Sequence, residues 1–165
     1  MRHPAGPVPF ADTRDLRRAI LRPHQSPAEL AAAEPDDPLA LAAGVRGDDG
    51  ALVAVGFVHP DPDAAPGDAA WRVRGMATAP EARGRGAGSA VLAVLLDHAA
   101  AHGAVRVWCN ARTPALSLYE RAGFTATSGV FDLPPMGPHV VMERTTPPPD
   151  TPPPRSPTPP RGGDR

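Results

Sequence analysis

The chain has 165 residues, 17 of them Lys or Arg and 18 Asp or Glu, and its formal net charge is −1 at pH 7. This length suits one domain with a tail, and the balanced charge argues against a dedicated nucleic-acid-binding protein. No apolar run approaches the roughly 20 residues that span a bilayer, the N-terminus lacks the apolar stretch of a signal peptide, and the single cysteine excludes an internal disulfide. We therefore expect a cytoplasmic protein with no membrane or nucleic-acid partner.

Proline marks the end of the predicted domain. Residues 145–165 read TTPPPDTPPPRSPTPPRGGDR, which is rich in proline and has no large apolar side chain. Such a segment buries too little apolar surface to offset the entropy lost on ordering. We predict one domain over residues 1–144 and a disordered Pro-rich tail over residues 145–165.

The first part of the domain predicts one helix and a β-hairpin. Asp12 is a suitable N-cap for a helix that ends near Leu21, because Pro23 stops it. The segment between this helix and the hairpin predicts a loop or a short helix. Two apolar runs, at 39–45 and 51–58, flank an Asp-Gly turn and predict the hairpin.

The second part of the domain alternates strands and helices. A strand over residues 71–78 has one polar face at its start and ends at Pro80. A helix over residues 88–102 carries an apolar stripe, and another helix opens at Pro114 and ends near Gly123. The remaining strands are predicted over residues 105–110, 124–130 and 139–144, and the stripe consists of Val91, Leu92, Leu95, Leu96 and Ala99. The order αβββαβαββ is that of a mixed α/β domain.

A glycine-rich turn lies between the third strand and the following helix, and it reads Arg83-Gly84-Arg85-Gly86-Ala87-Gly88-Ser89. Glycines let backbone N–H groups converge, and the N-terminus of the next helix adds positive charge, so the turn predicts a site for a phosphate or pyrophosphate. The P-loop pattern requires a lysine, which the chain lacks, and the dinucleotide fingerprint requires a third glycine where Ser89 stands. A plain strand-to-helix turn without a ligand is the alternative.

Three segments of the domain match the motifs of one enzyme family. The turn has the form [R/Q]-x-x-G-x-[G/A], residues 76–80 (MATAP) end the strand before it, and residues 115–124 (ALSLYERAGF) have the form A-x-x-x-Y-x-x-x-G-F. In these segments, and over roughly residues 12–144, the chain resembles the GNAT superfamily of Gcn5-related N-acetyltransferases. The resemblance implies a mixed central sheet of about six to seven strands flanked by helices. It also implies acetyl-CoA as cosubstrate and acetyl transfer to a primary amine of a small molecule or peptide, by direct attack in a ternary complex.

The resemblance assigns roles to individual residues. Backbone N–H groups of the turn, Arg83 to Ser89, would bind the pyrophosphate of acetyl-CoA. Backbone amides of Met76, Ala77 and Thr78 would orient the thioester and stabilise the oxyanion. Tyr119 stands at the general-acid position, where a phenol can protonate the departing thiolate.

The general base is the least defined part of this site, because the strand over residues 71–78 has no carboxylate. His139 enters the last strand after a Gly-Pro turn and is the first candidate, as a base that titrates near neutrality. Glu81, Asp132 and His59 are weaker candidates.

One position departs from the family pattern, and the first predicted helix carries a cluster of arginines. The position of the family's cofactor-binding asparagine holds Arg112, so Asn110 is expected to make that contact from a shifted place. The first helix carries Arg14, Arg17, Arg18 and Arg22, which are expected mostly on a solvated face. In the family this helix borders the acceptor cleft, where some of them would meet an acidic acceptor.

Two histidines and the single cysteine fit ordinary structural roles. His98 and His102 stand one helical turn apart, but without a third ligand they predict solvated histidines rather than a metal site. Cys109 predicts an inert buried thiol. The alternatives to an enzyme are a GNAT-like domain that binds CoA as a sensor or scaffold, and a protein that binds a nucleotide in the same turn. A homodimer is compatible with the family.

Overall fold

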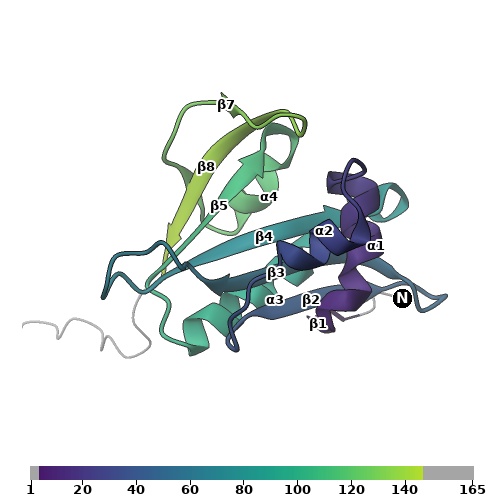
Figure 1. Cartoon of the computed structure of the whole chain (residues 1–165), viewed down its shortest axis with the longest axis horizontal. Helices are drawn as coiled ribbons and strands as arrows, with labels where there is room; N and C mark the ends of the chain where they lie inside the picture. The colour runs from purple at the N-terminus through teal and green to yellow at the C-terminus, as the bar shows by residue number, and fades with distance from the viewer. Residues whose placement is uncertain (1–3, 147–165) are drawn as a thin grey trace, which may run out of the picture.

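An eight-stranded sheet forms the centre of the molecule (Figure 1). The structure is a computed structural model that describes residues 4–146. The strands lie in the order β1-β2-β3-β4-β5-β8-β6, β7 also pairs with β8, and all neighbours are antiparallel except the parallel pair β4 and β5. The strands are β1 (Gly6–Pro7), β2 (Leu41–Arg46), β3 (Leu52–Pro60), β4 (Ala70–Thr78), β5 (Arg106–Arg112), β6 (Thr125–Ala126), β7 (Phe131–Asp132) and β8 (Pro138–Thr145). The helices are α1 (Phe10–Leu21), α2 (Pro27–Ala32), α3 (Ala87–Ala101) and α4 (Leu116–Arg121), with 3-10 turns η1 (Pro80–Ala82) and η2 (Thr113–Ala115).

Helices cover both faces of the sheet. In β3, Gly56 faces α3 so closely that a Cβ atom there would lie 3.2 Å from the Leu95 side chain. The next residue, Phe57, packs on Phe10 of α1 with ring centroids 5.4 Å apart. Because consecutive residues of a strand point to opposite faces, α3 lies on one face and α1 on the other (Figure 1). The predicted mixed α/β architecture is confirmed.

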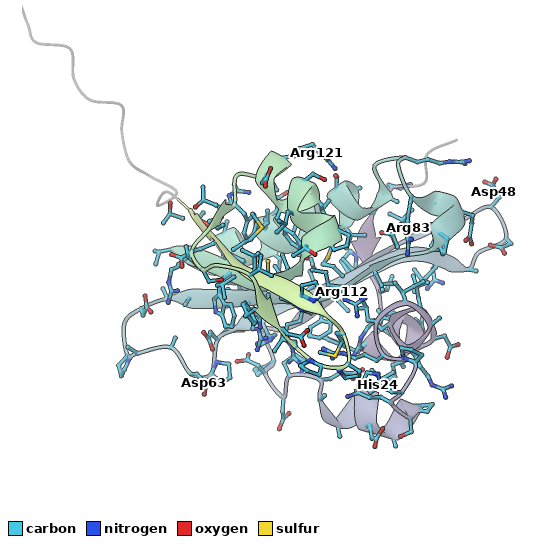
Figure 2. All side chains as sticks on the ribbon, turned by 90° about the horizontal axis from the view of Figure 1, so that it is seen from above. His24, Asp48, Asp63, Arg83, Arg112 and Arg121 are labelled. Carbon is cyan, nitrogen blue, oxygen red and sulfur yellow. The ribbon has the colours of Figure 1, made fainter. Side chains whose placement is uncertain are left out.

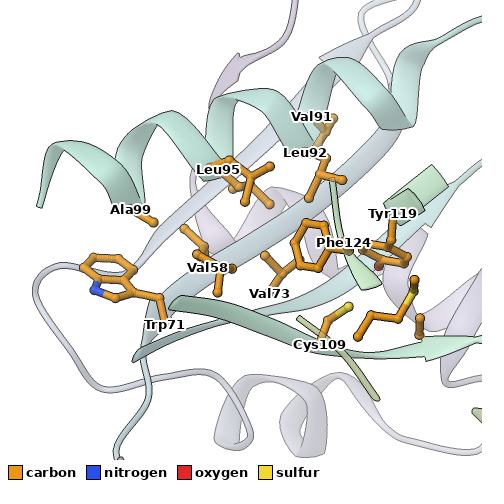
Figure 3. Packing of buried hydrophobic residues seen from close by; sticks show 14 of the residues in the cluster. Val58, Trp71, Val73, Val91, Leu92, Leu95, Ala99, Cys109, Tyr119 and Phe124 are labelled. Carbon is orange, nitrogen blue, oxygen red and sulfur yellow. The ribbon is translucent and has the colours of Figure 1, made fainter. Parts of the chain in front are cut away.

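The main hydrophobic core lies between α3 and the sheet (Figure 3). All five residues of the predicted α3 stripe are buried, and Leu95 is fully enclosed. Val58 and Val73 face this helix from β3 and β4, while Tyr119 and Phe124 close the core on the side of β5. The stripe predicted from helical periodicity is therefore the stripe that packs.

The first helix begins earlier than predicted. Pro9, with an extended backbone, is the N-cap residue, and Asp12 lies in the first turn of α1. There its carboxylate pairs with Arg46 at 3.0 Å and lies near the positive end of the helix. The predicted N-cap at Asp12 is wrong. An acidic residue is favourable both at the N-cap and in the first turn of a helix, so its presence alone does not locate the cap.

The strand predicted over residues 124–130 is wrong in extent. Only Thr125–Ala126 pairs with β8 among the described residues of that segment. The backbone then leaves the ladder, since the Val141 N–H donates to the Ser128 hydroxyl at 2.9 Å rather than to a carbonyl. The two-residue strands β1 and β7 were not predicted, because so short a strand leaves no periodic pattern. The predicted tail lies outside the described residues except for Thr145, where β8 ends, and Thr146.

β4 and β5 are paired over only part of their length. Parallel pairing ends at Arg72 and Trp108, although both strands continue beyond these residues. The register of β4 against β3 shifts between Val55 and Phe57, opposite Gly75, whose φ is +65°. A bulge of this kind bends and twists a strand, so the ends of β4 and β5 diverge (Figure 1).

Candidate active site

The divergence of β4 and β5 opens a cavity of about 530 Å³, called here the cleft cavity. Its walls come from the two strand ends, the last turn of α1, η2, α4 and the segment before β8. Figure 2 labels Arg83 and Arg112, which line it from the β4–α3 turn and from the end of β5. Candidates far apart in the sequence meet here, since Met76, Ala77, Thr78, Arg83, Asn110, Tyr119 and His139 all line this cavity.

The glycine-rich turn borders the cleft cavity at the N-terminus of α3. Gly86 is the N-cap residue, with φ +82°, a left-handed conformation that glycine adopts without strain. The Ala90 N–H donates to the Gly86 carbonyl oxygen at 3.0 Å. The N–H groups just before Ala90 therefore point out of the helix end. Arg83 Nε donates to the Thr78 carbonyl oxygen at 3.3 Å, which ties the turn to β4. The other turn candidates, Gly84, Arg85, Ala87, Gly88 and Ser89, surround this helix end.

The end of β4 turns one edge toward β3 and the other toward the cleft cavity. The Ala79 N–H donates to the Val53 carbonyl oxygen at 2.8 Å. Because backbone groups of consecutive strand residues alternate between the two edges, Ala77 also faces β3, whereas Thr78 faces the edge that β5 has left. Met76 lies in the bulge beside Gly75.

Tyr119 lies between the core and the cleft cavity. Its ring packs edge-on against Phe124 with centroids 5.5 Å apart. Burial, followed by interaction with the Cys109 thiol, raises the pKa of Tyr119. Burial likewise raises the pKa of the Cys109 thiol to about 12. Both groups therefore carry their protons at neutral pH.

His139 stands near the start of β8, opposite Arg112 of β5 and Phe131 of β7. The residue is 5% exposed, and its Nδ1 atom lies 2.7 Å from the Gly137 carbonyl oxygen. A carbonyl oxygen only accepts, so Nδ1 carries the proton and Nε2 of the neutral ring is an acceptor. The fold thus brings an imidazole acceptor into the same cavity as Tyr119.

The weaker base candidates lie elsewhere. Glu81 is exposed in η1, and Asp132 is exposed at the end of β7. His59 is buried in β3, with Nδ1 2.8 Å from the carbonyl oxygen of Pro60. None of these three described residues lines the cleft cavity.

A second cavity of about 230 Å³, called here the arginine cavity, adjoins the cleft cavity on the side of α1 and α2. Its lining includes Arg17 of α1, Arg22 directly after α1, and Arg72 and Arg74 of β4. The two cavities adjoin, since they share the lining residues Leu21, Arg22, Gly75, Asn110, Met136 and His139. Our sequence reasoning missed Arg72 and Arg74. The sequence did contain a signal for them. They are two residues apart on a predicted strand, so their side chains share one face of it.

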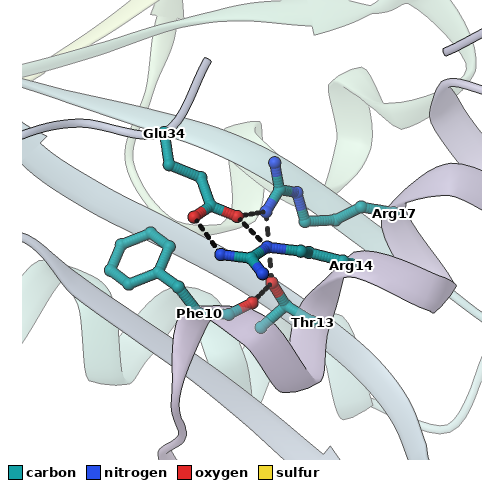
Figure 4. Close-up of polar contacts among 5 residues, drawn as sticks. All are labelled: Phe10, Thr13, Arg14, Arg17 and Glu34. Atoms are coloured by element: carbon teal, nitrogen blue, oxygen red, sulfur yellow. Dashed lines mark hydrogen bonds and ion pairs between the residues drawn. The ribbon is translucent and has the colours of Figure 1, made fainter. Parts of the chain in front are cut away.

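Glu34 binds two arginines of α1 (Figure 4). Arg14 donates to its carboxylate at 2.8 and 2.9 Å, and Arg17 donates at 2.9 Å. Burial acts to raise the pKa of Glu34, but the hydrogen bonds from both arginines outweigh it, and the pKa is lowered. Arg17 also donates to the Thr13 hydroxyl at 3.2 Å. The predicted solvated face is therefore wrong for Arg17, which is 4% exposed because α1 packs it over the Phe57 ring.

The histidines of α3 are engaged with the backbone. His98 Nε2 lies 2.7 Å from the Leu39 carbonyl oxygen, and His102 Nδ1 lies 2.8 Å from the His98 carbonyl oxygen. Within residues 4–146, no group of three His, Cys, Asp or Glu side chains is placed to hold a metal ion. No helix in this same range is long and apolar enough to cross a membrane.

The motifs around the cleft cavity extend to a match over most of the domain. Residues 10–124 match the model of the acetyltransferase (GNAT) family. The chain belongs to this GNAT family. A relative from Bacillus subtilis (strain 168), named as the uncharacterized N-acetyltransferase YitI, is 35% identical over 139 residues, which are 84% of this chain and 93% of that protein. The expected acetyl-CoA-dependent N-acyltransferase is thus confirmed at the level of the family.

Solved structures share the GNAT fold with this chain. A phosphinothricin acetyltransferase from Sinorhizobium meliloti, in complex with acetyl-CoA, has a TM-score of 0.69 at 18% identity and covers 88% of this chain and 89% of its own. An aminoglycoside 6'-N-acetyltransferase complexed with coenzyme A has a TM-score of 0.68 at 16% identity, covering 88% and 99%. A GCN5-related N-acetyltransferase from Kribbella flavida has a TM-score of 0.67 at 21% identity, covering 86% and 96%. The predicted fold is confirmed, and the short strands β1 and β7 bring the sheet to eight strands.

Proposed function

We propose that this chain transfers the acetyl group of acetyl-CoA to a primary amine of a small molecule or peptide, by direct attack in a ternary complex, and that residues 1–144 form the catalytic domain. The observation that carries the proposal is the divergence of β4 and β5 beyond Arg72 and Trp108. It opens the sheet at one place, between the N-terminus of α3 and the side chains of Tyr119 and His139. A thioester and an amine can meet there.

The β4–α3 turn supports the binding of the cofactor. Backbone N–H groups at the start of α3 and the guanidinium groups of Arg83 and Arg85 favour a pyrophosphate. The edge of β4 at Thr78 is not paired with β5, and the amides of the pantetheine arm can pair with backbone groups along it as an added strand would. These contacts would direct the thioester toward Tyr119.

The proposed reaction forms a C–N bond and breaks a C–S bond. The neutral amine attacks the thioester carbonyl carbon, and the oxygen that gains negative charge is stabilised by a backbone N–H group on the edge of β4 that β5 has left. The C–S bond then breaks, and the departing thiolate takes its proton from Tyr119, which regains one from solvent. Tyr119 suits this role because it lines the cleft cavity and because burial keeps its phenol protonated until the thiolate departs.

His139 is the proposed acceptor of the amine proton. Its Nδ1–H is engaged by the Gly137 carbonyl oxygen, so Nε2 is available to remove a proton directly or through one water molecule. Asn110, which lines the cavity from β5, is the proposed contact for the cofactor or acceptor beside it.

Two substitutions and two matched controls test this proposal. Thiol release from acetyl-CoA is measured with a panel of amines, and acetyl-CoA affinity is measured by calorimetry. We expect Tyr119→Phe to lower kcat about 100-fold without changing affinity, since proton transfer contributes about 10²–10⁴. Cys109→Ala removes the neighbouring thiol but keeps the phenol, and it should leave kcat within about threefold.

The histidine pair completes the test. His139→Gln is expected to lower kcat about 100-fold, whereas His24→Gln, at an exposed position in the α1–α2 loop, is expected to change nothing. Acetyl-CoA binding with no turnover of any amine would instead establish a CoA sensor or scaffold. Tighter binding of ATP than of CoA would establish a nucleotide-binding protein.

A further inference from the structure

The arginine cavity concentrates positive charge beside the cleft cavity. Arg17, Arg22, Arg72 and Arg74 all line its volume of about 230 Å³. In the part of the chain that the structure describes, no Asp or Glu side chain lines it. Arg17 is buried and the other three are half-buried. Charges withdrawn from water are ordinarily paired, so this arrangement is unusual for a structural role.

The four guanidinium groups are unequally compensated. Glu34 binds Arg17 at 2.9 Å, outside the cavity lining. Arg72 stacks on the Trp108 ring at 4.5 Å, and Asp61 and Asp63 partly offset its charge, but its Nε atom is buried without a hydrogen-bond partner among the described residues. Arg22 contacts the sulfur of Met136, which is only a weak acceptor.

Arg74 carries the least compensated charge. It lies 5.4 Å from the Phe57 ring centroid. Burial, and then repulsion from Arg72, Arg22 and Arg17, lowers its pKa to about 10. Like charges held together in this way destabilise a fold, so the cluster is explained if a ligand with negative charge occupies the space between them.

We propose that the arginine cavity binds an oxyanion of the acceptor, so that the substrate is an amine that also carries a carboxylate or a phosphorus oxyanion. The inference rests on the proposed function, because it places the anion in one cavity and the amine in the next. Guanidinium forks bind such planar or tetrahedral oxyanions with two N–H donors.

The shared lining sets the orientation of the acceptor. Gly75 and His139 line both cavities, so an anion held by Arg22 and Arg74 leaves the rest of the molecule directed toward the imidazole and Tyr119. A short acceptor such as an amino acid matches this arrangement. A polycationic amine does not, because its other ammonium groups would face the same arginines.

Matched acceptor pairs test the inference. Glycine, L-methionine and L-phenylalanine are each compared with the corresponding α-carboxamide, O-phosphoethanolamine is compared with ethanolamine, and spermidine represents polycations. We expect kcat/KM for the anionic member of at least one pair to exceed that of its neutral partner about 30-fold or more, as hydrogen bonds to charged groups allow. The pair with the larger ratio distinguishes a carboxylate from a phosphorus oxyanion. The carboxamides have the less basic amines, so intrinsic reactivity favours them and cannot produce this preference.

Variants of the cavity assign the preference to it. Arg22→Gln and Arg74→Gln are each expected to lower the ratio about tenfold and to leave the acetyl-CoA KM unchanged. Both should fold, since each relieves repulsion, and Arg74→Gln should not lower Tm. Arg46→Gln removes the same charge from an exposed ion pair on β2 and should leave the ratio unchanged.

The outcomes separate the two proposals. Equal or better turnover of the neutral amines or spermidine overturns the anionic acceptor and leaves acetyl transfer intact. Turnover of no amine overturns the proposed function, and binding then decides the inference. In that case the Tm of the protein saturated with acetyl-CoA is measured with and without each member of the matched acceptor pairs. A rise in Tm specific to the anions and lost in Arg74→Gln supports the oxyanion site, and its absence overturns the site.

Discussion

Arg112, at the end of β5, donates a hydrogen bond from Nη2 to the carbonyl oxygen of Leu21, in the last turn of α1, at 3.0 Å. Carbonyl groups in the last turn of a helix have no partner within the helix and favour a cation. Both residues line the cleft cavity. The contact therefore holds the end of α1 against the diverging end of β5.

Loss of this contact should loosen the acceptor side of the cleft cavity. We expect Arg112→Ala to raise the KM of the acceptor about 10- to 100-fold, the value of one hydrogen bond from a charged group. Arg106→Ala, at the other end of β5, breaks contacts to Asp68 and Glu143 outside the cavity and should affect Tm but not KM. Steady-state kinetics check both, and an unchanged acceptor KM in Arg112→Ala would contradict the positioning role.

The turn at Gly86 can be tested against a glycine of equal geometry. Gly86 has φ +82° and Gly50, in the β2–β3 turn, has φ +83°, and a Cβ atom would meet nothing within 4 Å at either position. Alanine at each position should therefore destabilise the fold by a similar amount, about 1 kcal/mol. Only Gly86→Ala should weaken acetyl-CoA binding, by about tenfold in calorimetry. Equal affinities of the two variants would argue that the turn does not bind the cofactor.

Glu34 should contribute to stability through its two arginines. Glu34→Gln leaves Arg17 buried beside a neutral amide, and we expect a loss of about 2–3 kcal/mol in the free energy of unfolding at pH 7. The pKa of the carboxyl is lowered from its ordinary 4.5 in the folded state. Its contribution is therefore full above that pH and is lost as the pH falls through the folded value. Denaturant unfolding at a series of pH values from 7 downward checks this, because the difference in stability between the two proteins should narrow as the pH falls below 4.5.

His59 should make the fold sensitive to acid. Burial is the main cause that lowers its pKa from the ordinary 6.5. The unfolded chain then binds a proton before the folded chain does, so stability is full above pH 6.5 and falls as the pH drops below it. We expect His59→Leu to reduce the loss of Tm between about pH 6.5 and 5. The exposed His24→Leu should retain the wild-type slope, and the same slope in both variants would contradict the prediction.

Features that depend on neighbours in the sequence were predictable. The α3 stripe follows from helical periodicity, and the turn at the N-terminus of α3 follows from glycines placed between a strand and a helix. The spacing from that turn to Tyr119 indicated the family. The stripe and the turn are each written within a few residues, where backbone geometry dictates which side chains share a face.

Features that depend on distant segments required the tertiary structure. The pairing of Glu34 with Arg17, the Cys109–Tyr119 contact and the divergence of β4 from β5 each join segments whose approach no local periodicity encodes. The clearest case is the arginine cavity. Along the chain, Arg22 and Arg74 resemble ordinary surface charges, and they face one space only because α1 packs across β4, where burial and mutual repulsion change what those charges can bind.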